Sequence, residues 1–502
     1  MKYIIKTVCI ALGLTFMSCG DDFLEKYNPT QLTAATYYSN KAEVQQAVNG
    51  VYSQLQDLVS IQWIFTEYIS DNTTLHFNIS DRGQGPDLEA IEYFQINSST
   101  GRITQWYNQL YRGLTNINIV LFKLKGAQMD DASKSDFEGQ LKFMRAYYYF
   151  QLVQSFGDVI IVTEPIASPD EAYTYARSSA ADVYTLIESD LKTAVSTLPV
   201  LSDVPAAYKG RLTKGAALSL LGKVYLTKKQ YAEAISTLQQ VTTMGYNLMP
   251  TYADVFDPAK KNNAESVFEV QFQANSDVGE WSGFTYNFYP RESNGAVIKF
   301  TGANGGGWNI PTREIIGLYE SGDLRKNVSV AEGYTNNKGE WVAVPFITKY
   351  YHEHTVQGRP GDNWPVIRYA DVLLMLAEAV NEQSGPGDSY SFVNQIRARA
   401  GLDPLSGLNK ESFRTAVLKE RRIELAFENH RWYDLKRTKS PAELATLLNA
   451  HGEFEKSNPT TDRGGIPFSA GDYKFEPYEA LFPIPANEIL IKKDLTQNEG
   501  YK

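Results

Sequence analysis

The chain has 502 residues and a formal net charge of −10, and 43% of its residues are hydrophobic while 21% are charged. This composition is typical of a globular protein large enough for two packed lobes or one long solenoid, and it excludes a disordered chain. The acidic balance, without a basic patch interleaved with aromatic residues, argues against nucleic acid as a partner. Because both cysteines, Cys9 and Cys19, lie near the N-terminus, the remainder can form neither a disulfide nor a thiolate metal site.

The N-terminus has the pattern of a secretory signal. Lys2 and Lys6 precede an apolar run over residues 8–16, which is too short to cross a bilayer in a mature protein. Ser18-Cys19-Gly20 then looks like a lipoprotein cleavage site. We therefore expect residues 1–18 to be a signal peptide and Cys19 to be the acylated first residue. Its acyl chains would anchor the protein to a membrane that it does not cross.

Helical periodicity dominates the first half of the mature chain. Leu221-Gly-Lys-Val-Tyr225 followed by Tyr231-Ala-Glu-Ala-Ile235 matches the spacing of tetratricopeptide helix pairs, which stack into a curved scaffold. Between about 60 and 100 the periodicity breaks, and long loops are expected. The expected helices cover residues 41–58, 102–124, 141–157, 179–198, 213–227 and 230–243.

The second half is less regular before it becomes helical again. Residues 266–272 alternate like a strand, and residues 273–310 have almost no helical period. A helix with Thr312 as a possible cap is expected over residues 311–320, followed by weak strands around 341–351. Helices resume at about 368, where residues 370–380 and 392–400 weakly repeat the tetratricopeptide pattern.

Residues 418–437 contain no Gly or Pro and are predicted to form one long helix. Its opposite charges stand three or four residues apart, which is typical of a solvated helix with surface ion pairs. The alternative is a partly buried network where several helices meet. We favour a structural role in which Glu424, Glu428, Arg431 and Asp434 connect the C-terminal helices to the repeat scaffold.

The same segment carries a family resemblance. Lys419-Glu-Arg-Arg-Ile-Glu-Leu-Ala-Phe-Glu-Asn-His-Arg-Trp-Tyr-Asp-Leu-Lys-Arg437 closely resembles the C-terminal signature of the SusD/RagB family, surface lipoproteins that capture nutrients in Bacteroidetes. Similar blocks stand at Asp21-Asp-Phe-Leu-Glu25, 368–379, 394–397 and 481–489. The resemblance implies a mainly α, tetratricopeptide-like α/α scaffold with long irregular loops and a few short β-strands. We expect an N-terminal region over 19–250 and a C-terminal region over 251–502 with the ligand loops, packed as one body.

No catalytic constellation stands out. His352-Glu353-His354 could place two imidazoles on one side of a strand, but no third metal ligand accompanies them. The glycine-rich run at 302–307 is not followed by the Lys-Ser/Thr of a phosphate-binding loop, and neither a nucleophile elbow nor a dinucleotide fingerprint is present. We therefore expect no enzyme activity, no cofactor and no metal.

Recognition of a sugar needs flat aromatic rings for its C–H faces and polar side chains for its hydroxyl groups. Two polar, aromatic-rich stretches have this composition, at 280–309 and at 63–78, although loop packing is the alternative for each ring. The candidate ligand residues are Trp281, Tyr286, Asn287, Tyr289, Arg291 and Trp308 in the first stretch, and Trp63, Asp71 and Asn72 in the second.

The resemblance implies a non-catalytic lipoprotein on the outer surface of the outer membrane. It would bind an oligosaccharide or polysaccharide and deliver it to a SusC-like TonB-dependent transporter. A peptide-capturing member of the same family is the first alternative. A surface glycoside hydrolase, for which paired carboxylates would suffice, is the second.

Overall fold

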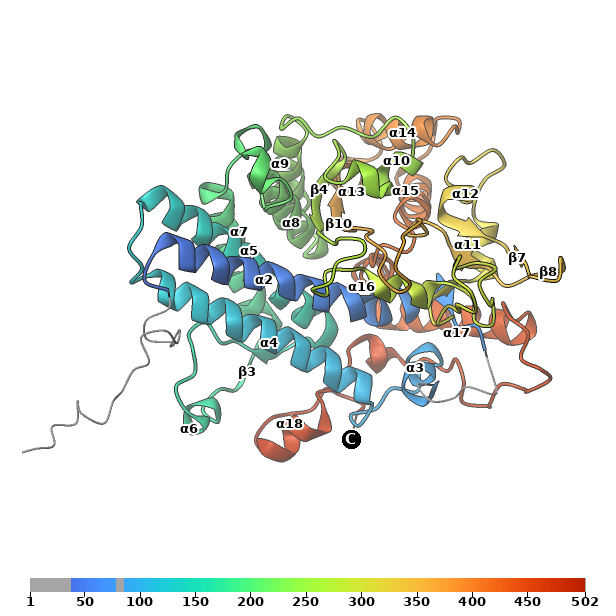
Figure 1. Cartoon of the computed structure of the whole chain (residues 1–502), viewed down its shortest axis with the longest axis horizontal. Helices are drawn as coiled ribbons and strands as arrows, with labels where there is room; N and C mark the ends of the chain where they lie inside the picture. The colour runs from blue at the N-terminus through green and yellow to red at the C-terminus, as the bar shows by residue number, and fades with distance from the viewer. Residues whose placement is uncertain (1–37, 78–84, 502) are drawn as a thin grey trace, which may run out of the picture.

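The computed structural model describes residues 38–77 and 85–501 (Figure 1). The predicted signal peptide, residues 1–18, and the predicted lipidation site, Cys19, lie outside these residues. Within the described ranges, no helix combines the length and the apolar character needed to cross a bilayer.

Long helices form the N-terminal half, as the periodicity predicts. α5 packs between α4 and α7, and α8 packs against α9 and against α13 of the C-terminal half. The bounds are α2 Lys41–Trp63, α4 Gly101–Leu124, α5 Asp131–Phe156, α6 Pro169–Ala172, α7 Ala180–Thr197, η4 Leu201–Asp203, η5 Ala206–Tyr208, α8 Lys214–Thr227 and α9 Tyr231–Val241.

The α8–α9 pair confirms the tetratricopeptide-like prediction. Gly222 of α8 faces Leu238 of α9 so closely that a Cβ atom at this position would overlap the leucine side chain. The glycine therefore allows two antiparallel helices to approach, which is the physical basis of the spacing seen in the sequence. The helical scaffold and its few short strands also confirm the predicted fold class.

The prediction of long loops over residues 60–100 is wrong in part, because this range also contains helices. α2 continues into the π-helix η3, Ile64–Tyr68, and a further helix, α3, spans Gly85–Glu92. Leu88 and Ile91 of α3 are buried, so the helix is held by tertiary packing, although its sequence pattern is weak. The three consecutive tyrosines of α5, Tyr147, Tyr148 and Tyr149, are all buried and pack in the core.

Short paired strands occur in both halves of the chain, and the C-terminal half adds further helices. Every sheet in the described residues has two antiparallel strands, with the pairs β1–β5, β2–β3, β4–β10, β6–β9 and β7–β8. The strands are β1 Thr73–Thr74, β2 Val159–Ile160, β3 Arg177–Ser178, β4 Ser266–Val270, β5 Ile310–Pro311, β6 Val330–Ala331, β7 Tyr334–Thr335, β8 Trp341–Val342, β9 Phe346–Ile347 and β10 Trp364–Arg368. The helices are α10 Ala253–Phe256, η6 Pro258–Lys260, η7 Gly283–Phe288, α11 Arg313–Gly317, α12 Lys326–Ser329, α13 Tyr369–Ser384, α14 Ser389–Arg399, α15 Lys410–Glu424, α16 Arg431–Thr438, α17 Pro441–Ser457, η8 Pro477–Ala480 and α18 Ala486–Ile491.

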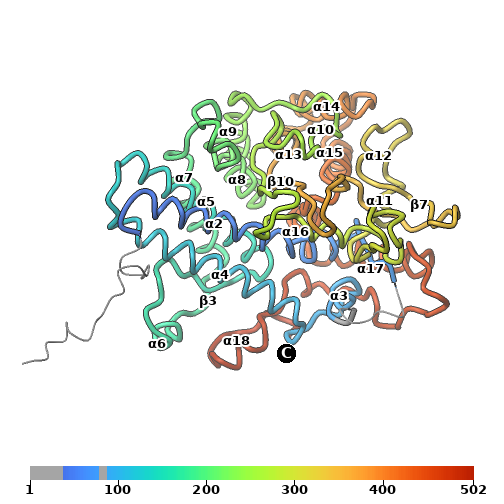
Figure 2. Tube along the Cα trace, in the orientation of Figure 1, coloured from blue at the N-terminus to red at the C-terminus, as the bar shows by residue number. Residues whose placement is uncertain are grey.

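The C-terminal segment, red in Figure 2, returns to helices of the N-terminal half. The amide of Tyr473 donates to the carbonyl of Tyr93 at 2.9 Å, and that of Phe482 donates to Ser155 at 2.8 Å. Segments from the two ends of the chain therefore share one core.

The single helix predicted over 418–437 is wrong, because the structure divides it into α15 and α16. Phe427 and Asn429 between them have φ values of 66° and 67°, which a right-handed helix cannot contain. The break has a physical reason. The carbonyl of Ala426 accepts a hydrogen bond from Lys349 Nζ at 2.8 Å, and the amide of Phe427 donates to the Glu67 carboxylate at 3.1 Å. A continuous helix would use these backbone groups internally.

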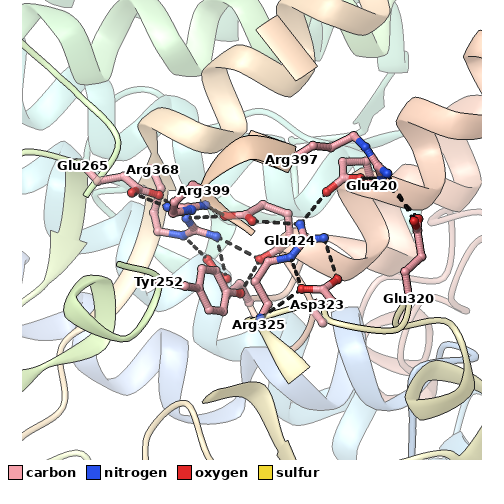
Figure 3. Close-up of polar contacts among 12 residues, drawn as sticks. Tyr252, Glu265, Glu320, Asp323, Arg325, Arg368, Arg397, Arg399, Glu420 and Glu424 are labelled. Atoms are coloured by element: carbon pink, nitrogen blue, oxygen red, sulfur yellow. Dashed lines mark hydrogen bonds and ion pairs between the residues drawn. The ribbon is translucent and has the colours of Figure 1, made fainter. Parts of the chain in front are cut away.

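Buried ion pairs gather around this break (Figure 3). Arg368 donates from Nε to Glu428 at 2.7 Å and from Nη1 to Glu424 at 3.1 Å, and it also pairs with Glu265. We call the whole set the central ion-pair network; it comprises Glu265, Asp323, Arg325, Lys349, Arg368, Arg397, Arg399, Glu420, Glu424 and Glu428. Glu424 and Glu428 of the predicted set therefore belong to this buried network. The other two, Arg431 and Asp434, pair with Asp71 and Arg421.

The cations of the network lower the pKa of Glu424 and of Glu428. Burial alone would raise the pKa of Glu424, but the guanidinium groups of Arg399, Arg368 and Arg325 lower it to about 2. The ring of Tyr252 lies against the cations, 5.1 Å from Lys349 Nζ and 5.1 Å from Arg399 Cζ. These cation–π contacts give the buried positive charges a further favourable neighbour.

Candidate ligand-binding surface

Two backbone segments, 286–291 and 305–309, pair to form the compact loop that carries most of the candidate residues. The amide of Gly306 donates to the carbonyl of Tyr286 at 2.8 Å, and those of Gly307 and Trp308 donate to Tyr289 and Asn287 at 2.9 and 2.8 Å. A Cβ atom on Gly305 would overlap the carbonyl of Tyr289. The glycine-rich run therefore serves close backbone approach.

Replacing Gly305 with alanine is expected to open this loop locally. The new methyl group must push the two backbone segments apart, and such overpacking costs about 1–3 kcal/mol. Limited proteolysis should then show faster cleavage within residues 281–309. Gly317→Ala is the control, because a Cβ atom there meets nothing within 4 Å. Equal cleavage rates for the two variants would contradict the steric argument.

The inner part of the loop is buried. Trp308 is 7% exposed and lies under the guanidinium of Arg291, whose Cζ is 3.8 Å from the ring centroid. Arg291 also donates from Nε to the carbonyl of Gly306 at 2.6 Å, and the hydroxyl of Tyr289 donates to the carbonyl of Tyr350 at 2.5 Å. Tyr289, Arg291 and Trp308 therefore hold the loop together from within.

The outer part of the loop is solvent-accessible and includes Trp281, Tyr286 and Asn287, which are partly exposed. The guanidinium of Arg359 lies 4.9 Å from the Trp281 ring. Arg359 donates in turn to the carbonyl of Ser276 at 2.9 Å and to Asp277 at 2.7 Å. The stacked cation fixes one face of the indole ring.

Tyr286 is held by a chain of hydrogen bonds. Gly358 N–H donates to its hydroxyl at 3.0 Å, and the hydroxyl lies 2.7 Å from His354 Nε2. His354 Nδ1 is 3.0 Å from the carbonyl of His352, which can only accept, so Nδ1 carries a proton. In the neutral imidazole Nε2 therefore accepts from Tyr286. Phe300 packs on the same histidine, with ring centroids 5.3 Å apart.

We call Trp281, Tyr286, Phe300, His354 and Arg359 the aromatic surface. It offers ring faces beside a cation, an imidazole and the side-chain amide of Asn287, which is the chemistry that a sugar ring and its hydroxyl groups require. Three of these residues, Phe300, His354 and Arg359, are missing from the sequence-based candidates. The composition of residues 351–362 does not indicate that this segment packs against Trp281 and Tyr286.

The three candidates from the earlier stretch lie in the interior, and we do not propose them as ligand contacts. Trp63 packs edge-on against Phe288, with ring centroids 5.9 Å apart. Asp71 accepts two hydrogen bonds of 2.7 Å from Arg431 and pairs with Arg422 at 3.1 Å. Burial would raise the pKa of Asp71, but these two guanidinium groups hold it well below its usual range.

Asn72 has the same structural role as Asp71. Its amide donates to Glu67 at 2.8 Å, and its oxygen accepts from Arg422 at 2.7 Å. The polar stretch at 71–72 thus links the end of η3 to α15, and its composition reflects buried hydrogen bonding.

His352 and His354 do not converge on one point. His352 Nδ1 contacts Asp362, whereas His354 faces Tyr286. The described part of the chain contains no group of three or more His, Cys, Asp or Glu residues placed to hold a metal ion.

The fold is a tetratricopeptide-like scaffold, and its irregular loops carry accessible aromatic rings. This combination is typical of a helical-repeat protein that binds ligands. Sequence similarity to known families identifies which one. Residues 325–501 match the model described as "SusD family", and residues 22–226 match the model described as "Starch-binding associating with outer membrane". The chain belongs to the SusD/RagB family.

Similar proteins align with most of the chain. It is 25% identical to SusD-like protein P25 of Formosa agariphila, with 99% of each chain covered. It is 22% identical to the starch-binding protein SusD of Bacteroides thetaiotaomicron, over 83% of this chain and 81% of the relative. Among solved structures, a laminarin binding SusD-like protein is 28% identical with a TM-score of 0.75, covering 92% of this chain and 100% of the other.

Proposed function

We propose that the protein is a cell-surface glycan-binding lipoprotein that uses the aromatic surface to capture an oligosaccharide or polysaccharide. The observation that carries the proposal is the placement of Trp281, Tyr286 and Phe300 beside Arg359 and His354. The names of relatives that bind starch and laminarin support the same ligand class.

The proposal includes attachment and delivery. Acylation of Cys19 would hold the protein at the outer membrane, and a SusC-like TonB-dependent transporter would receive the ligand. Co-purification of such a transporter with the full chain from solubilised outer membrane supports this part, and its absence counts against it. We further propose that capture is non-catalytic. A reducing-end assay on the bound polysaccharide should detect no new ends, and their appearance would favour the glycoside hydrolase alternative.

Replacing Trp281 with alanine is expected to weaken glycan binding about tenfold or more. Truncating a central aromatic contact typically costs more than about 1 kcal/mol, and about 1.4 kcal/mol corresponds to tenfold in affinity. Affinity gel electrophoresis provides the measurement. The gel contains laminarin, starch or another polysaccharide that retards the unmodified protein.

Trp341→Ala is the matched control for this experiment. Trp341 is 63% exposed but lies on the β7–β8 hairpin, outside the aromatic surface. Loss of retention in Trp281→Ala alone supports the site. If the two variants migrate alike, the aromatic surface is not the binding site. Titration against peptide pools separates the peptide-capturing alternative.

A further inference from the structure

A concave surface that shares no residue with the aromatic surface is lined by Arg313 and by residues between 453 and 470. Its volume is about 750 Å³, within the usual range of roughly 300–1,000 Å³ for ligand pockets. Its walls come from the start of α11, the end of α17 and the loop at 459–470. We call it the C-terminal cleft.

Two hydrogen bonds from backbone amides link the C-terminal cleft to the loop that carries Trp308. The amide of His76 donates to the carbonyl of Gly307 at 2.6 Å, and the amide of the next residue, Phe77, donates to Thr461 at 3.4 Å. Residues 76–77 therefore bridge the loop that carries Trp308 and the wall of the cleft. Arg313, on that wall, follows Trp308 by only five positions.

Three cations line the C-terminal cleft: Arg313, Lys456 and Arg463. Two acids also line it, but both have partners. Glu453 pairs with Lys456 at 3.0 Å, and Asp462 accepts from the amide of Gly464 at 2.9 Å. With three cations and two acids, the walls have a formal net charge of +1, in a chain whose overall net charge is −10.

Neither arginine of the cleft forms an ion pair with a carboxylate among residues 38–77 and 85–501. Arg313 donates to the amide oxygen of Asn458 at 3.3 Å, which is a neutral partner. Elsewhere in the fold, arginines such as Arg368 and Arg422 meet two or more carboxylates. The charges of Arg313 and Arg463 are thus left for an external anion.

Arg463 is held rigidly in place. Its Cζ lies 4.1 Å from the Phe77 ring centroid and 3.8 Å from that of Phe468. Its Nη1 donates to the hydroxyl of Tyr93 at 2.8 Å, and its Nε donates to the carbonyl of Ile466 at 3.1 Å. A guanidinium fixed between rings loses little conformational freedom when it binds an anion.

A buried carboxyl group behind the wall does not neutralise Arg313. Glu455 accepts from the hydroxyl and the amide of Thr460 at 2.8 and 3.1 Å. Burial raises the pKa of Glu455 above its usual range, although Thr460 and Arg313 act in the opposite direction. Glu455 therefore has Thr460 as its hydrogen-bond partner, and no ion pair joins it to Arg313 in the described part of the chain.

We propose that the C-terminal cleft binds an anionic substituent of the captured glycan, a carboxylate or a sulfate ester, between Arg313 and Arg463. Arginine recognises both groups through charge-assisted hydrogen bonds. Pro467 and Phe468 in the same wall offer apolar contact to a sugar ring. This inference rests on the proposed glycan-binding function and narrows its ligand to acidic glycans.

Calorimetric titration of the full chain with three probes tests the proposal. An oligogalacturonate carries carboxylates, a dextran sulfate oligomer carries sulfate esters, and maltoheptaose is neutral. We expect at least one anionic probe to bind and to lose affinity as salt rises, because screening weakens exposed charge pairs. Arg313→Ala should weaken that binding about tenfold or more, which corresponds to about 1.4 kcal/mol.

Arg112→Ala is the matched control, because Arg112 is exposed on α4 and its loss changes net charge without touching the cleft. The probe that binds identifies the anion as carboxylate or sulfate. The inference is overturned if no anionic probe binds, or if Arg313→Ala binds like Arg112→Ala. A neutral glycan that binds through Trp281 while both anionic probes fail would leave the proposed function standing and remove this inference alone.

Discussion

Replacing Arg368 with methionine is expected to destabilise the protein by about 3–5 kcal/mol, the usual effect of breaking a buried ion pair from one side. Arg368 is fully buried and contacts Glu265, Glu424 and Glu428. Methionine matches much of its volume but leaves these carboxylates without their shared cation. Urea unfolding followed by circular dichroism provides the measurement.

Two further variants make the Arg368 result interpretable. Arg112→Met removes an exposed arginine and should change stability by less than about 0.5 kcal/mol. Arg368→Lys keeps the charge but loses the fork that contacts two carboxylates at once, so its stability should lie between those of the natural protein and Arg368→Met. If Arg368→Met unfolds at the same urea concentration as Arg112→Met, the central ion-pair network is not a major source of stability.

Replacing Glu67 with glutamine is expected to change how stability depends on pH. Burial raises the pKa of Glu67 to about 7, although hydrogen bonds from Asn72 and Phe427 and the charge of Lys349 oppose the shift. The unfolded chain titrates near 4.5, so the folded state binds the extra proton between about pH 4.5 and 7. Stability from this group is complete below pH 4.5 and is lost as the pH rises through 7.

Glutamine cannot ionise, so the variant should gain stability relative to the natural protein as the pH rises. A shift of this size corresponds to at most about 3 kcal/mol between pH 4.5 and 8. Urea unfolding of both proteins at pH 5 and pH 8 measures the difference. Glu233→Gln, at an exposed position on α9, is the control and should follow the natural protein. A pH-independent difference for Glu67→Gln would contradict the buried, protonated carboxyl group.

The helical scaffold could be predicted from sequence because its signals are local. Leu221 to Tyr225 and Tyr231 to Ile235 specify a helix pair through spacing alone, and the structure places α8 and α9 there. The turn between α15 and α16 could not be predicted this way. Residues 418–437 contain neither Gly nor Pro, and the break depends on Lys349 and Glu67, which are distant in the sequence.

The candidate site shows the same limit. Trp281 and Trp308 look equivalent in the sequence, yet Trp308 is covered by Arg291 whereas Trp281 is partly exposed. Asp71 resembles a polar loop residue until α15 and α16 bring Arg422 and Arg431 against it. Composition predicts which loops are polar and aromatic, but the side chain that faces solvent is decided by tertiary contacts.

The central ion-pair network also sets the order in which a growing chain can complete its fold. Arg325 and Arg368 are synthesised long before Glu420, Glu424 and Glu428, which supply most of their partners. Until those glutamates exist, closing the interior would bury cations that have only Asp323 or Glu265 as a partner, at a cost in free energy. Contacts between such distant positions form late and slow folding. We therefore expect the interior to close late in folding, once the C-terminal helices are present.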